Sequence, residues 1–135
     1  MAWVEPKTDW TSQDAFDYVA YNRVTDNIMH LKELANYLFS SLNQFELETE
    51  KDNLSLIYAR HMNDIENGLK SINDTTYRHN IGETKSYKPN GNVPDFTEYN
   101  RIESACLSLY NQLQSHKQNL PRLALRLGNQ KGIKV

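Results

Sequence analysis

Residues that commonly carry out catalysis occur in this chain, but their spacing does not form a recognisable site. The histidines are His30, His61, His79 and His116. No two of them stand at the HxxxH or HExxH spacing that places two imidazoles beside one metal ion. The sequence also lacks a glycine-rich phosphate loop and a nucleophile elbow. We therefore expect no enzyme, no catalytic, cofactor-binding or metal-binding residue, and no small-molecule substrate.

Cys106 is the only cysteine, which excludes an intrachain disulfide and a multi-cysteine metal site. It stands four residues after Ile102 and three before Leu109, positions that share one face of a helix. We therefore expect a small, buried, apolar side chain rather than a reactive thiol.

The elements that position these side chains are predicted to form one domain. The chain has 135 residues, 39% of them hydrophobic and 24% charged, with a net charge of -2. No run approaches the roughly 18 to 20 apolar residues that span a bilayer, and the N-terminus lacks a basic region followed by an apolar one. We therefore expect a protein that is made in the cytosol, stays soluble and has no membrane partner.

Three segments show the apolar spacing of amphipathic helices: residues 18–42, 54–72 and 97–116. Residues 77–96 contain two glycines and two prolines, which favours a long, irregular connection. The predicted fold class is mainly α, a small bundle of three helices within a domain of residues 1–119.

The end of the chain changes its apolar period. Leucines alternate with more polar residues in the basic segment of residues 120–135, and a period of two predicts a short strand or hairpin. A two-stranded hairpin alone is marginal in water, so this segment needs the helices or another subunit to cover its apolar face. The residues expected to bind that partner are Arg122, Leu123, Leu125, Arg126 and Leu127.

The three predicted helices share a motif whose most regular feature is an asparagine. The segments "YNRVTDNIMHL", "MNDIENGLKSI" and "YNRIESACLSL" align on asparagines at intervals of 41 and 37 residues. Their apolar residues lie three or four positions apart, which predicts one core-facing side on each helix. The motif residues are Asn22, Ile28, Asn63, Ile65, Glu66, Gly68, Asn100, Ile102 and Glu103.

The sequence leaves two roles open for the motif asparagine. Asn63 with Glu66, and Asn100 with Glu103, match the two ends of a capping box. The apolar stripes, however, begin a turn or more earlier. In the second role, an asparagine inside a helix bonds to a neighbouring backbone group and ties two helix starts together.

The fifth position after each motif asparagine carries a residue without bulk: Asn27, Gly68 or Ala105. A glycine inside a helix costs about 1 kcal/mol relative to alanine, so Gly68 predicts the close approach of another backbone. Three similar helices packed through this face would form a bundle with internal pseudo-symmetry.

The order of these motifs resembles that in tail proteins of phages and prophages of Gram-positive bacteria. The run "PKTDWTSQDAFDYVAYNRVTDNIMHLKEL" is similar to segments there in which KTxW, an aromatic residue, YNRI and an NI..L tail follow one another. The stretch "HMNDIENGL" is similar to an NxIENGI helix of tail-fibre and baseplate proteins. "FTEYNRIESACLSLYNQL" looks like a further copy, and the resemblance covers about half of the chain.

This resemblance implies a virion structural protein: a baseplate, tail-tip or fibre-attachment component, located in the tail and assembled in the host cytoplasm. Its partners would be other tail or baseplate subunits, together with further copies of itself in a symmetric assembly. Two positions depart from the pattern, with Thr25 where glutamate is usual and Asp64 where arginine is common.

The alternative function is that of a small helical nucleic-acid-binding or regulatory protein that uses the basic C-terminal end. Arg122 and Arg126 are suited to contact phosphate. The segment lacks interleaved aromatic residues, however, and the chain is not basic overall. The sequence therefore favours a protein partner with an acidic surface.

Overall fold

The chain forms a helical bundle. Its structure, a computed structural model, describes residues 3–39, 45–54, 56–76, 78–91 and 93–134, with side chains up to residue 120. Within these ranges there are three helices and no strand, which confirms the prediction of a mainly α protein.

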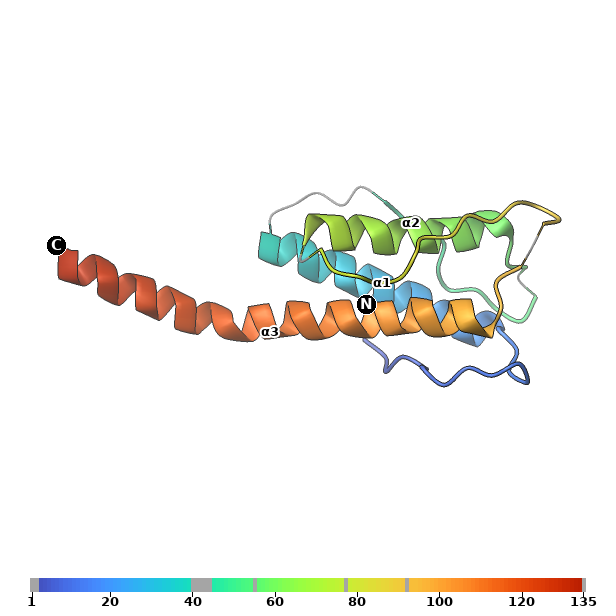
Figure 1. Cartoon of the computed structure of the whole chain (residues 1–135), viewed down its shortest axis with the longest axis horizontal. Coiled ribbons are helices and arrows are strands. Elements are labelled where there is room, and N and C mark those ends of the chain that lie inside the picture. Colours follow the sequence, from blue (N-terminus) through green and yellow to red (C-terminus); the bar gives the residue numbers. More distant parts are fainter. Residues whose placement is uncertain (1–2, 40–44, 55, 77, 92, 135) are drawn as a thin grey trace.

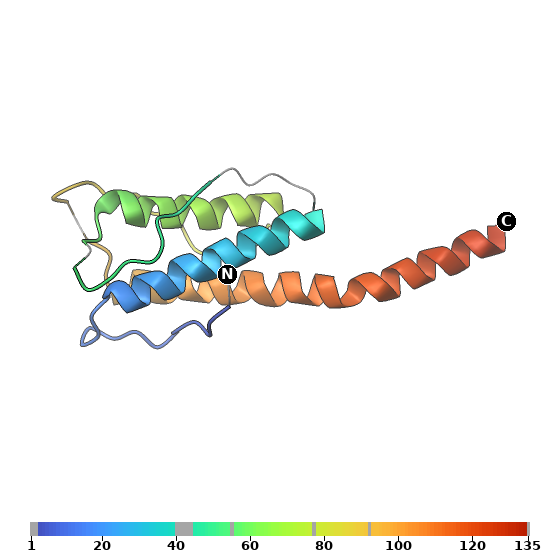
Figure 2. The same cartoon turned by 180° about the vertical axis from the view of Figure 1, so that it is seen from behind.

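The helices are α1 (Tyr18–Phe39), α2 (Ala59–Thr75) and α3 (Phe96–Lys134). Each helix packs against the other two. Figures 1 and 2 show that all three run in the same direction, so that their first turns lie at one end of the bundle. Parallel helices cannot be joined by tight turns, and the chain must return along the bundle after α1 and after α2.

Extended segments lie along the three grooves between the helices. Residues 3–10 bond to both α1 and α3. Residues 45–51 contact α1 and α2, and residues 78–87 contact α2 and α3. Figure 1 shows the last of these running back along α2. The described part of residues 77–96 before α3 is irregular, as its glycines and prolines predict.

The apolar stripes of the three helices meet in a shared core. Its most buried members are 0–1% exposed, and fully burying one such aliphatic side chain stabilises the fold by roughly 1.5–3 kcal/mol. Cys106 is 1% exposed in this core, and burial raises the pKa of its thiol. The aliphatic members are Val24, Ile28, Leu31, Ile65, Leu69, Ile72, Ile102, Leu109 and Leu113.

The helix starts follow local capping. Asp17 and Asp95 each accept a backbone N–H of the first turn at 3.0 Å, which fixes the starts of α1 and α3. The second helix begins at Ala59, later than the predicted start at residue 54. The residues Leu54 and Tyr58 extended the predicted period, but both are exposed in the segment before the helix.

The third helix continues beyond the other two. The ring centroids of His116 and Phe39, the last residue of α1, lie 5.1 Å apart. The backbone of α3 stays helical from there to Lys134. Figure 1 shows this extension projecting from the bundle without another helix beside it.

The strand or hairpin predicted for residues 120–135 stays a prediction, because the structure describes no side chain of residues 121–135. The side chains of the five predicted partner-binding residues lie outside the described part, so their role stays a prediction. These are Arg122, Leu123, Leu125, Arg126 and Leu127.

Candidate functional site

Each motif asparagine lies inside its helix, four residues after the helix begins, and bonds to the main chain of a distant residue. Asn22 Nδ2 donates to the carbonyl of Lys51 at 2.8 Å, and the N–H of Lys51 donates to Asn22 Oδ1 at 2.8 Å. We call this two-bond contact a clamp. It satisfies both backbone polar groups of one extended residue, as a neighbouring strand would.

The other two motif asparagines form the same clamp. Asn63 accepts the N–H of Tyr87 at 2.6 Å and donates to its carbonyl at 2.8 Å. Asn100 holds Trp10 in the same way, at 2.7 Å and 3.0 Å. The motif asparagines are therefore not N-caps. They bond to a neighbouring backbone, but this backbone belongs to an extended segment and not to a second helix start.

The clamps connect three similar units in a ring. A unit consists of one extended segment and the helix that follows it. The first helix clamps the segment of the second unit, the second helix clamps that of the third, and the third helix clamps that of the first. The bundle therefore has the internal pseudo-symmetry that the repeated motif predicts, and its order is threefold.

A buried carboxylate stabilises one of the three contacts between neighbouring units, which we call the corners of the ring. Glu103 is 1% exposed and accepts two bonds from the guanidinium of Arg23, both at 2.7 Å. It also accepts the indole N–H of Trp10 and, at 3.0 Å, the N–H of Lys7. The bond to Glu103 raises the pKa of Arg23. This carboxylate thus joins the first and third units with all its bonds charge-assisted.

A second corner has the same design. Glu66 is 2% exposed and accepts the hydroxyl of Tyr87 at 2.7 Å and the guanidinium of Arg101. Burial and the bond to Glu66 raise the pKa of Tyr87. As at the first corner, the arginine directly follows one motif asparagine, and the glutamate stands three residues after another. The clamped residue is aromatic at both corners.

The third corner lacks this ion pair. The arginine position is occupied by Asp64 and the glutamate position by Thr25, whose hydroxyl donates to the carbonyl of Tyr21 at 3.0 Å. Burial, followed by the charges of Glu48 and Asp64, raises the pKa of Tyr21 to about 12. Both departures from the tail-protein pattern therefore fall at one contact.

The small residues at the fifth position leave room for the extended segments. A Cβ atom on Gly68 would lie 3.1 Å from the ring of Phe45 and 3.5 Å from a methyl group of Ile28. The predicted close approach is therefore present, although a side chain makes it. The equivalent Asn27 clamps the main chain of Val4, at 2.8 Å and 2.7 Å.

Hydrogen exchange offers a test of single clamps. We expect Asn22→Ala to remove the exchange protection of the Lys51 amide and to leave the amides of Trp10 and Tyr87 protected, because each N–H has its own asparagine acceptor. Asn22→Asp, which keeps an acceptor oxygen, is the matched control. Loss of protection at all three amides, or at none, would contradict the clamp assignment.

His61 is a buried histidine whose two nitrogens have different partners. Nδ1 accepts the N–H of Tyr58 at 2.8 Å, which leaves Nε2 to carry the proton and donate to Glu48. Burial and the nearby charge of Lys51 lower the pKa of His61, although Glu48 acts in the opposite direction. The imidazole therefore caps α2 in its neutral form.

The stability of the protein should depend on pH through this group. Because the pKa of His61 is lower in the folded state, the unfolded chain binds the proton first as pH falls through about 6.5. We expect the free energy of unfolding to be constant above that range and to decrease below it, by no more than about 1.4 kcal/mol per pH unit. Denaturant titrations at pH 7.5 and 5.5 measure the change. His61→Asn, which cannot take up this proton, should remove it.

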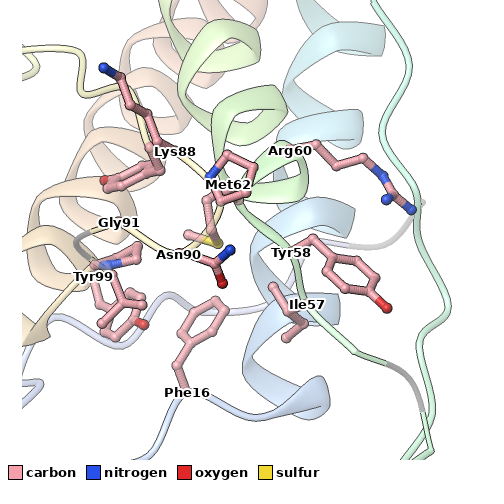
Figure 3. A pocket seen from close by; sticks show the side chains of 14 residues that line it. Phe16, Ile57, Tyr58, Arg60, Met62, Lys88, Asn90, Gly91 and Tyr99 are labelled. Atoms are coloured by element: carbon pink, nitrogen blue, oxygen red, sulfur yellow. The ribbon is translucent and has the colours of Figure 1, made fainter.

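The start of the bundle contains an apolar pocket, which we call the pole pocket. It has a volume of about 580 Å³. Figure 3 shows Phe16, Met62 and Tyr99 at its centre, with Arg60 and Lys88 on opposite sides. Cavities of roughly 300–1,000 Å³ with apolar walls and a few polar groups are typical of binding sites.

Several large, exposed hydrophobic side chains stand close in the sequence to the residues that line this pocket. Most of those on the described chain belong to the first turns of the helices or to the segments just before them, whereas the opposite end of the bundle exposes few. A cluster of this kind is typical of a surface that meets another molecule. The residues are Tyr18, Val19, Leu54, Leu56, Tyr58, Val93 and Phe96.

Two other kinds of site were sought in the described part of the chain. No group of three or more histidine, cysteine or acidic residues there is placed to hold a metal ion. No described helix combines the length and apolar character needed to cross a membrane. Comparisons with family models, curated proteins and solved structures find no match to the chain.

Sequence analysis missed the clamped residues and the pole pocket. Trp10, Lys51 and Tyr87 stand 12, 12 and 13 residues before the asparagine of their own unit, so a wider alignment of the repeats contains the signal. Nothing in single-sequence spacing indicates the pocket, because its walls come from three separate segments.

Proposed function

We propose that this protein is a structural component of a phage tail, at the baseplate, tail tip or fibre attachment, and that it acts by assembling with other subunits. The observation that carries this proposal is the projecting part of α3. Beyond His116 the helix has no neighbouring helix in the described chain, and its sequence contains Pro121, Gly128 and Gly132. A helix with these residues is not stable alone in water, so its formation requires a partner.

The remaining features support the same function. The resemblance to tail proteins covers segments from all three units, and these units are joined to one another by clamps and buried ion pairs. The proposed partners are other tail or baseplate subunits and further copies of the chain. The proposed location is the virion tail, after assembly in the host cytoplasm.

Truncation after Leu120 tests this proposal. Because the core lies within residues 20–113, we expect the truncated protein to keep its helical circular dichroism and cooperative unfolding but to be lost from assembled tails. Electron microscopy of purified particles with labelled full-length and truncated chains measures incorporation. Tails that never contain the full-length chain would contradict the function. Global unfolding of the truncated chain would contradict the division of roles.

Nucleic-acid binding remains the second candidate, because every charged residue after Glu103 is basic. Retention of the full chain on a generic DNA duplex at increasing salt distinguishes the two. We expect weak retention at low salt. Tight binding that falls steeply with salt concentration would favour the nucleic-acid function over the structural one.

A further inference from the structure

Several side chains that line the pole pocket are held in place by contacts within the protein. Phe16 stacks on Tyr99 with ring centroids 4.3 Å apart. Tyr87 is held by the Asn63 clamp through its main chain and by Glu66 through its hydroxyl. The pocket therefore costs little conformational entropy to occupy, as binding sites with preorganised walls do.

The rim of the pocket leaves apolar surface in water. Val93 is 82% exposed and Tyr58 is 48% exposed, and both line the pocket. Ile57 and Met62 also line the pocket and are labelled in Figure 3. An apolar side chain inserted here would bury surface on the floor and on the rim together, at a gain of about 25 cal/mol per Å².

The charged residues that line the pocket are both basic, and one of them, Arg60, also lies 3.7 Å from the carboxylate of Glu48. Arg60 and Lys88 are its charged lining residues, and no carboxylate occurs among the other lining residues that the structure describes. These two cations lie on opposite sides of the opening in Figure 3. The pocket therefore selects a segment with carboxylates on both sides of an apolar side chain. The basic C-terminal end of another copy of this chain carries the wrong charge.

We propose that the pole pocket docks an acidic segment of a partner subunit, which inserts a leucine or aromatic side chain between flanking carboxylates that face Arg60 and Lys88. The inference rests on the proposed function only in assigning this segment to a tail subunit. The pole pocket and the projecting part of α3 then give the protein two separate contacts, one at each end of the bundle.

A peptide-binding experiment on the intact chain tests the docking. The probe is the peptide Glu-Glu-Leu-Phe-Glu-Glu with a fluorescent label, and its counterpart has lysine at every glutamate. We expect the acidic peptide to bind and the basic one to bind at least tenfold more weakly. Val93→Glu should weaken the acidic peptide at least tenfold by placing a like charge on the rim, whereas Val93→Lys should not weaken it. Both substitutions are at an exposed position and leave the core intact.

The outcomes separate this inference from the proposed function. Equal binding of both peptides, binding of neither, or acidic-peptide binding that Val93→Glu leaves unchanged would overturn the pocket assignment. The same variants are scored for incorporation into tails in a separate measurement. A chain that binds the acidic peptide but is absent from tails would contradict the proposed function and leave the docking site standing.

Discussion

Replacing Glu103 with glutamine is expected to lower the free energy of unfolding by roughly 3 kcal/mol. The carboxylate is 1% exposed and accepts bonds from Arg23, Trp10 and Lys7. Glutamine keeps the shape but offers one acceptor oxygen, and its NH₂ group would face a donor. The guanidinium of Arg23, which is only 18% exposed, would lose its partner.

Chemical denaturation monitored by tryptophan fluorescence measures this effect, because Trp10 lies at the same corner. Glu83→Gln is the matched control, since Glu83 is 83% exposed and its ion pair with Lys85 spans 3.5 Å. The control should change stability by less than about 0.5 kcal/mol. If Glu103→Gln had as small an effect as the control, the buried corner would not be a main source of stability.

Introducing the missing ion pair at the third corner is expected to reveal strong energetic coupling between the substitutions Thr25→Glu and Asp64→Arg. Thr25→Glu alone places a carboxylate at a fully buried position without a partner, and should cost roughly 3 kcal/mol. Asp64→Arg alone changes an exposed residue and should have little effect. Together they recreate the arginine and glutamate of the other two corners, and we expect the double variant to recover roughly 2 kcal/mol of the loss.

A double-mutant cycle of denaturation free energies measures this coupling. The control pair combines Thr25→Glu with Asp64→Ala, which removes the negative charge but supplies no guanidinium. Equal recovery in both pairs would mean that relief of repulsion, and not a new ion pair, explains the result. Additive effects in the arginine pair would contradict the threefold equivalence of the corners.

The helices could be predicted from the sequence because their signal is local. Apolar residues at helical spacing give α1, α2 and α3, and the same spacing identifies the core. The start of α2 was wrongly predicted at residue 54 instead of Ala59, and this error also has a local cause. Leu54 and Tyr58 continue the apolar pattern, and periodicity alone does not distinguish an exposed apolar residue from a buried one.

The contacts between units could not be predicted in the same way. Asn100 and Trp10 are 90 residues apart, and either one alone is compatible with a cap, a turn or a solvent-exposed side chain. The motif showed that three asparagines are equivalent but not what they bind. That information depends on the direction of the helices, because only between parallel helices does the chain return past the asparagine of the helix that it has just left.

The projecting part of α3 has a consequence for stoichiometry. A homotrimer of identical units would have to extend three helices or none. Joining three unequal units in one chain allows only the last helix to continue, so the threefold body carries a single arm. One molecule therefore carries one projecting helix for each body, a ratio that a symmetric trimer of the same units has no means of setting.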